Sequence, residues 1–264
     1  MDKKSTSVPV HNPSEYGIGI KDALTALADL ALPRTCIICG RQLLMRERHI
    51  CIYCMSDLPL THFWTLSHNP MADMFNGKIQ ETSNIGLGER YAYAAALFYY
   101  QSEAGYKKIT QQLKYHSNLS AGRHFAKMLG HELANSLQFK DVDCVMPVPL
   151  HWTRRWKRGY NQSEVIASEL AVGLKAALET RIIYRARHTR TQTKLSMEEK
   201  SANVCSAFRV RKCALRQLAS FRHILLVDDV FTTGATLTAC YRTLREGFPS
   251  TFRISIATLG FVGR

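Results

Sequence analysis

The chain has 264 residues, 46% hydrophobic and 21% charged, and its 35 Lys and Arg against 21 Asp and Glu give a net charge of +14. This length and apolar content allow one large domain or two smaller ones and exclude an intrinsically disordered protein. The absence of an 18-residue apolar run excludes a membrane-spanning helix, and eight cysteines are too few for a disulfide scaffold, so we expect a soluble, cytoplasmic protein. The positive charge favours polyanionic partners, such as nucleic acid, phosphorylated metabolites or anionic lipid, over a role in solubility alone.

The N-terminal 60 residues predict a tail followed by a small metal-binding unit. Residues 1–18 are polar and predict a flexible tail, and apolar residues at helical spacing predict an amphipathic helix over 20–32, within a unit spanning 19–60. Two C-x-x-C pairs follow, separated by eleven residues. Each pair presents two thiolates from a tight turn, and together they match a tetrahedral structural zinc site. The predicted zinc ligands are Cys36, Cys39, Cys51 and Cys54.

The alternatives for these cysteines are two redox dithiols or incidental residues. A redox C-x-x-C pair is typical of a helix start that follows a strand, and the sequence predicts that setting for neither pair. The spacing therefore favours zinc.

Residues 61–90 show little periodicity and contain three glycines, so they predict a connector. Over 91–264, strands alternate with helices, which predicts an α/β domain with a largely parallel sheet flanked by helices. The predicted strands are 94–100, 142–146, 182–184, 207–210, 224–227 and 252–256. The apolar stripes of the predicted helices lie at 109–113, 125–137, 166–178 and 237–244, the third helix opening at a capping box of Asn161 and Glu164.

The most informative stretch runs from residue 224 to 236. Four apolar residues describe a strand buried on both faces, and Asp228 and Asp229 follow where it would leave the sheet, which is where open α/β sheets bind ligands. Carboxylates there accept hydrogen bonds from sugar hydroxyls or bind Mg²⁺. The next residues lead into a helix and offer main-chain N–H groups, hydroxyls and a glycine, a pattern typical of phosphate binding. This predicted phosphate loop consists of Thr232, Thr233, Gly234, Ala235 and Thr236.

This stretch resembles the phosphoribosyl pyrophosphate signature of type I phosphoribosyltransferases. The remaining motifs narrow the resemblance to the ComF family of competence-associated, phosphoribosyltransferase-like proteins, which carry an N-terminal zinc finger. They are the cysteine-rich head, residues 145–149, Arg154-Arg155, residues 158–162, and Thr189-x-x-Gln192-x-x-Leu195 with Asn203 and Ala207-Phe208. The resemblance extends from about residue 23 to the C-terminus, and one departure is Lys200, where family members usually carry Arg.

The resemblance implies a type I phosphoribosyltransferase fold over 91–264 and a role for each motif. Asp228 and Asp229 would be the catalytic acids that hold the ribose hydroxyls of phosphoribosyl pyrophosphate with the help of Mg²⁺, and residues 232–236 would surround the 5-phosphate. Pro147, Val148 and Pro149 would form the pyrophosphate loop, and residues 187–203 would form a mobile basic loop that closes over the site. The family's association with natural competence implies a role in DNA uptake, with competence proteins among the partners.

A basic run of Arg154, Arg155, Lys157 and Arg158 is a candidate nucleic-acid site, because Trp152, Trp156 and Tyr160 interleave with it and rings beside cations hold single-stranded DNA. The alternatives are a solvated loop, or aromatic residues that anchor the loop to the domain. Two further basic groups are Arg185, Arg187, Arg190 and Lys194, and Arg209, Arg211, Lys212 and Arg216.

Two functional classes stay open at this point. One is an active phosphoribosyltransferase with an unidentified acceptor. The other is a non-catalytic single-stranded DNA-binding competence factor that retains the phosphoribosyl site for ligand sensing.

Overall fold

The computed structural model describes residues 33–81, 90–100, 105–115, 118–186, 207–211, 220–247 and 252–263. The chain forms two compact units, Met1–Met55 and Ser56–Arg264. The predicted tail, the predicted helix at 20–32 and the predicted closing loop at 187–203 lie outside the described residues.

The N-terminal unit folds its described residues, 33–55, around two tight turns. In the first turn the N–H of Gly40 donates to the carbonyl of Cys36 at 2.8 Å, and Gly40 adopts a φ of 76°, a conformation that favours glycine. An isolated antiparallel bridge between Thr35 and Gln42 closes this turn. The second turn leads into the short helix α2, Ile52–Ser56. These turns place both cysteine pairs at the bends of the chain.

The larger unit is built on a five-stranded parallel sheet with the strand order β1-β7-β6-β2-β3. The strands are β1 Ala94–Tyr99, β2 Cys144–Pro147, β3 Ala177–Leu178, β6 His223–Phe231 and β7 Arg253–Phe261. A separate antiparallel pair consists of β4 Ile183–Arg185 and β5 Phe208–Val210. Successive residues of β1, β2 and β7 are buried, as a parallel sheet covered on both faces requires.

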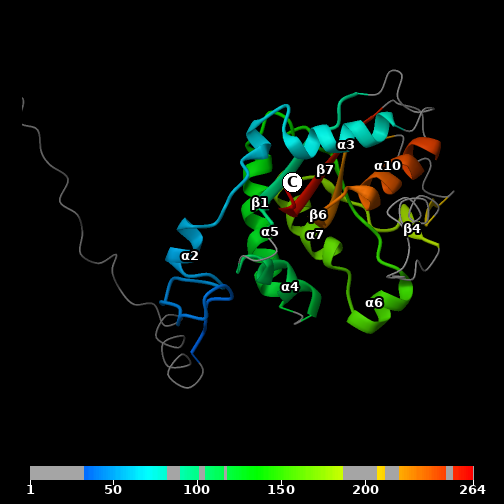
Figure 1. Cartoon of the computed structure of the whole chain (residues 1–264). Coiled ribbons are helices and arrows are strands. Elements are labelled where there is room, and N and C mark those ends of the chain that lie inside the picture. The colour runs from blue at the N-terminus through cyan, green and yellow to red at the C-terminus, as the bar shows by residue number, and fades with distance from the viewer. Residues whose placement is uncertain are drawn as a thin grey trace, which may run out of the picture. The chain divides into compact units, whose positions relative to one another are not determined.

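Helices cover both faces of this sheet, as the α/β pattern predicted (Figure 1). Helices α3, Pro70–Gln80, and α10, Ala235–Gly247, pack together on one face. Helices α5, Leu119–Ala134, and α7, Gln162–Leu174, pack together on the other face, and α4, Lys107–Tyr115, lies against α5. The short elements η2, Phe63–Thr65, and α6, Trp152–Arg158, complete the unit.

Helix α3 lies within residues 61–90, where the sequence predicted a connector without regular structure. Asn69 caps its N-terminus by accepting a hydrogen bond from the N–H of Ala72 at 2.9 Å, and Pro70 occupies its first turn. Met71 and Phe75 are fully buried in the core that α3 shares with β1 and α10. The segment therefore adds a helix to the layer over the sheet.

Two predicted helices end earlier than their apolar stripes indicated. Leu178, predicted on the face of α7, lies in β3, because Lys175 takes a left-handed conformation with a φ of 55° and ends the helix. Leu137, predicted on α5, lies beyond that helix and is 76% exposed. In both cases an apolar residue at helical spacing continued the pattern past the last helical turn.

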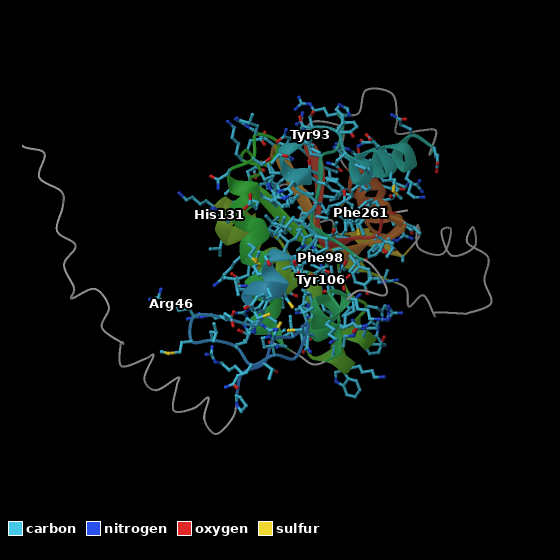
Figure 2. The ribbon with its side chains drawn as sticks, turned by 60° about the vertical axis from the view of Figure 1, so that its left-hand side comes forward. Arg46, Tyr93, Phe98, Tyr106, His131 and Phe261 are labelled. Carbon is cyan, nitrogen blue, oxygen red and sulfur yellow. The ribbon has the colours of Figure 1, made fainter. Side chains whose placement is uncertain are left out.

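Aromatic residues pack together at the carboxyl ends of the strands. The ring of Phe261 on β7 lies 5.4 Å from the ring of Phe63 and 5.9 Å from the ring of Phe231, which ends β6. Figure 2 shows Phe98 and Phe261 in the body of the unit and His131 at the outer side of α5. This packing fixes the end of β6, from which the chain enters the predicted phosphate loop. Within the described residues, no helix combines the length and hydropathy needed to cross a bilayer.

Candidate functional site

The paired acids lie within strand β6, which continues through Phe231, whereas the sequence predicted that the strand would end before them. Asp228 pairs in register with Thr258 of β7, and Val230 pairs with Gly260. The extension arises because β7 is nine residues long and provides a hydrogen-bonding partner along this whole stretch. The acids are therefore held by the sheet at its carboxyl edge.

Hydrogen bonds and one ion pair fix both carboxylates. The Ser163 hydroxyl donates to Oδ1 of Asp228 at 2.8 Å, and the N–H of Asp229 donates to the same oxygen at 2.9 Å. Nζ of Lys114, near the end of α4, lies 2.7 Å from Oδ2 of Asp229. The Asp229 side chain is only 13% exposed, so this ion pair is shielded from water on most sides.

The environment of the acid pair changes its protonation. Burial, together with the charge of Asp229, raises the pKa of Asp228 to about 7, against the hydrogen bonds from Ser163 and Asp229 that lower it. Burial alone would lower the pKa of Lys114, but the Asp229 carboxylate outweighs burial and raises it. At neutral pH the site thus contains a permanent ammonium, and Asp228 titrates within the physiological range.

The predicted phosphate loop, residues 232–236, follows β6 and is called the threonine turn below. It shares a pocket with Asp228. A pocket of about 30 Å³ is lined by Asp228, by the end of β6 and by every residue of the turn 232–236. Gly234 takes a φ of 74°, and a Cβ there would lie 2.6 Å from Cζ of Phe231, so the turn needs glycine for two reasons. Helix α10 begins at Ala235, directly after this glycine, so its first N–H groups belong to the pocket's edge.

Residues 158–163 form hydrogen bonds with three parts of the molecule around this site. The Tyr160 hydroxyl donates to the carbonyl of Leu113, next to Lys114. Asn161 caps α7 by accepting from the N–H of Ser163 at 3.2 Å, and its amide donates to the carbonyl of Val148 at 3.0 Å. The motif therefore links α4, the predicted pyrophosphate loop and the acid pair.

The sequence did not identify Lys114 or Ser163 as parts of the site. Ser163 lies two residues past Asn161, a residue of the predicted motif, so a signal was present but weak. Lys114 had no signal, because only the packing of α4 brings its side chain to β6.

The predicted pyrophosphate loop begins at the end of β2, which lies beside β6 with Pro147 paired to Val227. The N–H of Val148 donates to the carbonyl of Val227 at 2.8 Å, one residue before the acid pair. The loop and the acids thus end neighbouring parallel strands at the same edge of the sheet.

The basic run forms helix α6 rather than a loop, and Arg155 and Lys157 are exposed, so a solvated surface remains the alternative to a nucleic-acid site. His151 caps its N-terminus, and Gly159, with a φ of 79°, ends it. Arg155 lies 3.4 Å from Glu164 of α7. Trp152 and Trp156, one helical turn apart, are 70% and 87% exposed, so α6 presents two large rings to solvent.

The four cysteines of the two pairs come together in the N-terminal unit. Their Sγ atoms all lie within 4.8 Å of one another, and Sγ of Cys39 lies 3.7 Å from Sγ of Cys51. Four sulfurs at zinc–sulfur distance from one ion stand about 3.8 Å apart, so this cluster could hold a structural metal such as zinc. The cluster confirms that the two pairs form one four-cysteine group.

The second cysteine pair lies at a helix start that does not follow a strand. Cys51 directly precedes helix α2, and the described residues before it form only isolated bridges, the nearest between Arg48 and Ile50. Burial opposes ionisation of the Cys36 thiol, but main-chain N–H groups of Cys39, Cys51 and Ile38 outweigh it and lower its pKa to about 7. A thiol that ionises near neutral pH is suited to metal binding.

Comparison with known proteins gives relatives that are named as a competence protein and as DNA utilization proteins. No family model matches the chain. Competence protein F of Haemophilus influenzae is 31% identical over 141 residues, 52% of this chain and 61% of that protein. The DNA utilization protein YhgH of Salmonella typhimurium is 31% identical over 149 residues, 55% of this chain and 63% of that protein. These matches support the resemblance to the ComF family that the sequence motifs indicated. The match spans only about three-fifths of either relative's own length.

Proposed function

We propose that the chain is a phosphoribosyltransferase-like protein that binds phosphoribosyl pyrophosphate with Mg²⁺ and acts in DNA uptake and natural competence. One observation supports the ligand above all others. Asp228 and the whole threonine turn line the same pocket, so a single small molecule can contact both. A carboxylate beside a phosphate-binding turn suits a ribose 5-phosphate, which carries hydroxyls next to a phosphate.

Different groups of the chain would contact the ribose, the 5-phosphate and the pyrophosphate of the ligand. The carboxylates of Asp228 and Asp229 would accept hydrogen bonds from the ribose hydroxyls. The hydroxyls of the turn and the N–H groups at the start of α10 would bind the 5-phosphate, where the helix dipole favours negative charge. The loop 147–149, at the end of the neighbouring strand, would contact the pyrophosphate. Mg²⁺, when bound, would neutralise part of the pyrophosphate charge as it departs.

Mg²⁺ suits this donor set, because carboxylates and phosphate oxygens are the hard ligands that it prefers. The ligand must also replace Lys114, whose ammonium lies 2.7 Å from Asp229. Binding would then exchange one ion pair for hydrogen bonds to the sugar, and Lys114 would be free to approach the ligand's phosphates.

The names of the relatives support the cellular role. One is called a competence protein and the other a DNA utilization protein, and neither name states a ligand. The four-cysteine cluster is proposed to hold one structural zinc ion, which would fix the two turns of the N-terminal unit.

A second candidate function is single-stranded DNA binding without catalysis, with the phosphoribosyl site retained for ligand sensing. The observation that favours it is the pair of exposed tryptophans on the basic helix α6. The two candidates are compatible, because both bind a phosphoribosyl ligand. Only the first extends to transfer of the phosphoribosyl group to an acceptor.

Ligand-induced thermal stabilisation tests the first proposal. Saturating phosphoribosyl pyrophosphate with Mg²⁺ should raise the melting temperature of the full chain, and a hundredfold excess over Kd stabilises by about 2.7 kcal/mol. Asp228→Asn and Asp229→Asn should each remove most of this shift. Asp57→Asn, at an exposed position, serves as the control and should keep it. An equal shift in all four proteins would place the ligand elsewhere and overturn the proposal.

A further inference from the structure

A second pocket lies beside β2, on the side away from the acid pair. It has a volume of about 1100 Å³ and shares no lining residue with the pocket at Asp228. Its floor includes the buried residues Ile182 and Ile183. We call it the arginine groove, and the residues that define its character are Arg155, Arg181, Arg185, Arg211, Trp152 and Tyr184.

The groove collects cations from segments far apart in the sequence. Arg155 comes from α6, Arg185 from β4 and Arg211 from the residue after β5, so each of the three basic groups of the sequence contributes one arginine. Arg181 is the fourth. Two acids, Glu164 and Glu179, also line the groove, and Glu164 offsets Arg155 at 3.4 Å. The lining thus keeps a net positive charge, which suits an anionic ligand.

Two aromatic rings accompany these arginines. Trp152 is 70% exposed at the rim, and Tyr184 is 39% exposed. The guanidinium of Arg211 lies 5.2 Å from the centre of the Tyr184 ring, a distance at which cation and ring attract each other. Solvent-exposed rings beside guanidinium groups are the combination that stacks bases and pairs phosphates.

We propose that the arginine groove binds nucleoside phosphates, with the base stacked on Trp152 or Tyr184 and the phosphate paired with Arg181 and Arg211. This chemistry is shared by a free nucleotide and by one unit of a single strand. The planar guanidinium fork matches a phosphate in two hydrogen bonds, and the ring faces give the base a partner that a simple anion would not use. The groove shares Pro147 and Pro149 with the loop proposed to contact the pyrophosphate but no residue with the pocket at Asp228, so it lies beside the phosphoribosyl pocket, and its single-strand arm rests on the second candidate function.

The test compares two groove variants with two matched controls in the full chain. The groove variants are Trp152→Ala and the double variant Arg181→Ala/Arg211→Ala. The controls are Leu137→Ala, a 76% exposed large apolar residue beyond α5 that does not line the groove, and Lys140→Ala/Arg222→Ala, which removes the same charge at exposed positions near the other end of β2 and β6. The probe is a fluorescein-labelled fifteen-nucleotide oligothymidylate, followed by anisotropy, with dTMP as competitor.

Both groove variants should weaken oligothymidylate binding about tenfold, since stacking of one base contributes about 1–3 kcal/mol and each factor of ten is 1.4 kcal/mol. The control variants should bind as the parent does. The double groove variant should also reduce the dependence of affinity on salt, because it removes phosphate contacts. Displacement of the probe by dTMP would identify a free nucleotide as sufficient, and probe binding without dTMP competition would identify a strand.

Three results would overturn the proposal. These are no binding of the oligothymidylate to the parent chain, equal losses in groove and control variants, and loss of the phosphoribosyl pyrophosphate stabilisation in the groove variants. The last result would make the groove part of the phosphoribosyl site. Because that stabilisation is measured separately, failure of the groove and failure of the phosphoribosyl pocket can be distinguished.

Discussion

Replacing Asp228 by Asn should make the unliganded protein more stable at high pH while it abolishes ligand binding. Burial and the charge of Asp229 raise the pKa of Asp228 to about 7 from its ordinary value of 3.8. A carboxyl whose pKa is higher in the folded state binds its proton more tightly there, so stability falls as pH rises from about 4 to about 7. A shift of about three units corresponds to about 4 kcal/mol as an upper limit at alkaline pH.

The Asn side chain avoids this loss because it carries no charge. Its oxygen can still accept the hydrogen bonds that the Ser163 hydroxyl and the Asp229 N–H make to Oδ1 of Asp228. We therefore expect the difference in unfolding free energy between variant and parent to be smallest near pH 4, to favour the variant increasingly up to about pH 7, and to change little above that.

Urea unfolding at five pH values between 4 and 8 measures this difference. Subtracting the unfolding free energy of the parent from that of the variant at each pH removes the contribution of other titrating groups. One such group is His223, whose pKa is lowered mainly by burial. Asp57→Asn, at an exposed position, provides the matched control and should show a constant difference. If Asp228→Asn follows the parent's pH dependence as closely as the control does, Asp228 is not the buried, titrating acid described above.

Three further predictions concern the cysteine cluster and the helix packing. Purified protein should contain about one zinc ion per chain by metal analysis, and Cys36→Ser should lose it; a folded, metal-free Cys36→Ser variant whose N-terminal unit resists proteolysis as the parent does would argue against a structural metal. Gly173→Ala should lower the unfolding free energy by about 1–3 kcal/mol, because its Cβ would lie 3.1 Å from main-chain atoms of Gly130 where α7 packs on α5. Gly77→Ala, in helix α3 with open space around it, should instead stabilise by up to about 1 kcal/mol in the same urea experiment.

The sequence predicted the order of elements over the sheet because buried parallel strands and amphipathic helices leave strong local patterns. Helix α3 was missed although Asn69, Pro70 and the spacing of Met71, Phe75 and Ile79 are helix signals. Its glycine and polar residues diluted the pattern, and the burial that stabilises it comes from β1 and α10, which are distant in sequence. Helix propensity alone therefore underestimated a segment that tertiary packing stabilises.

The candidate site likewise contains residues that the sequence could predict and residues that it could not. The acid pair and the threonine turn are contiguous in sequence, so their residue types could be recognised together. Lys114 and Ser163 belong to α4 and α7, and only the packing of those helices against α5 and β6 brings their side chains to the carboxylates. No local pattern distinguishes such residues from any exposed lysine or helix-cap serine.

The start of α7 connects the two pockets. Asn161 lines the arginine groove, and its amide donates to the carbonyl of Val148 in the loop between the pockets. Two residues later, the Ser163 hydroxyl donates to Asp228, which lines the pocket of the threonine turn. Both bonds depend on the same first turn of α7, so a ligand that moves this turn from one side must change the hydrogen bonding on the other. Residues 158–163 therefore set the geometry of both pockets at once.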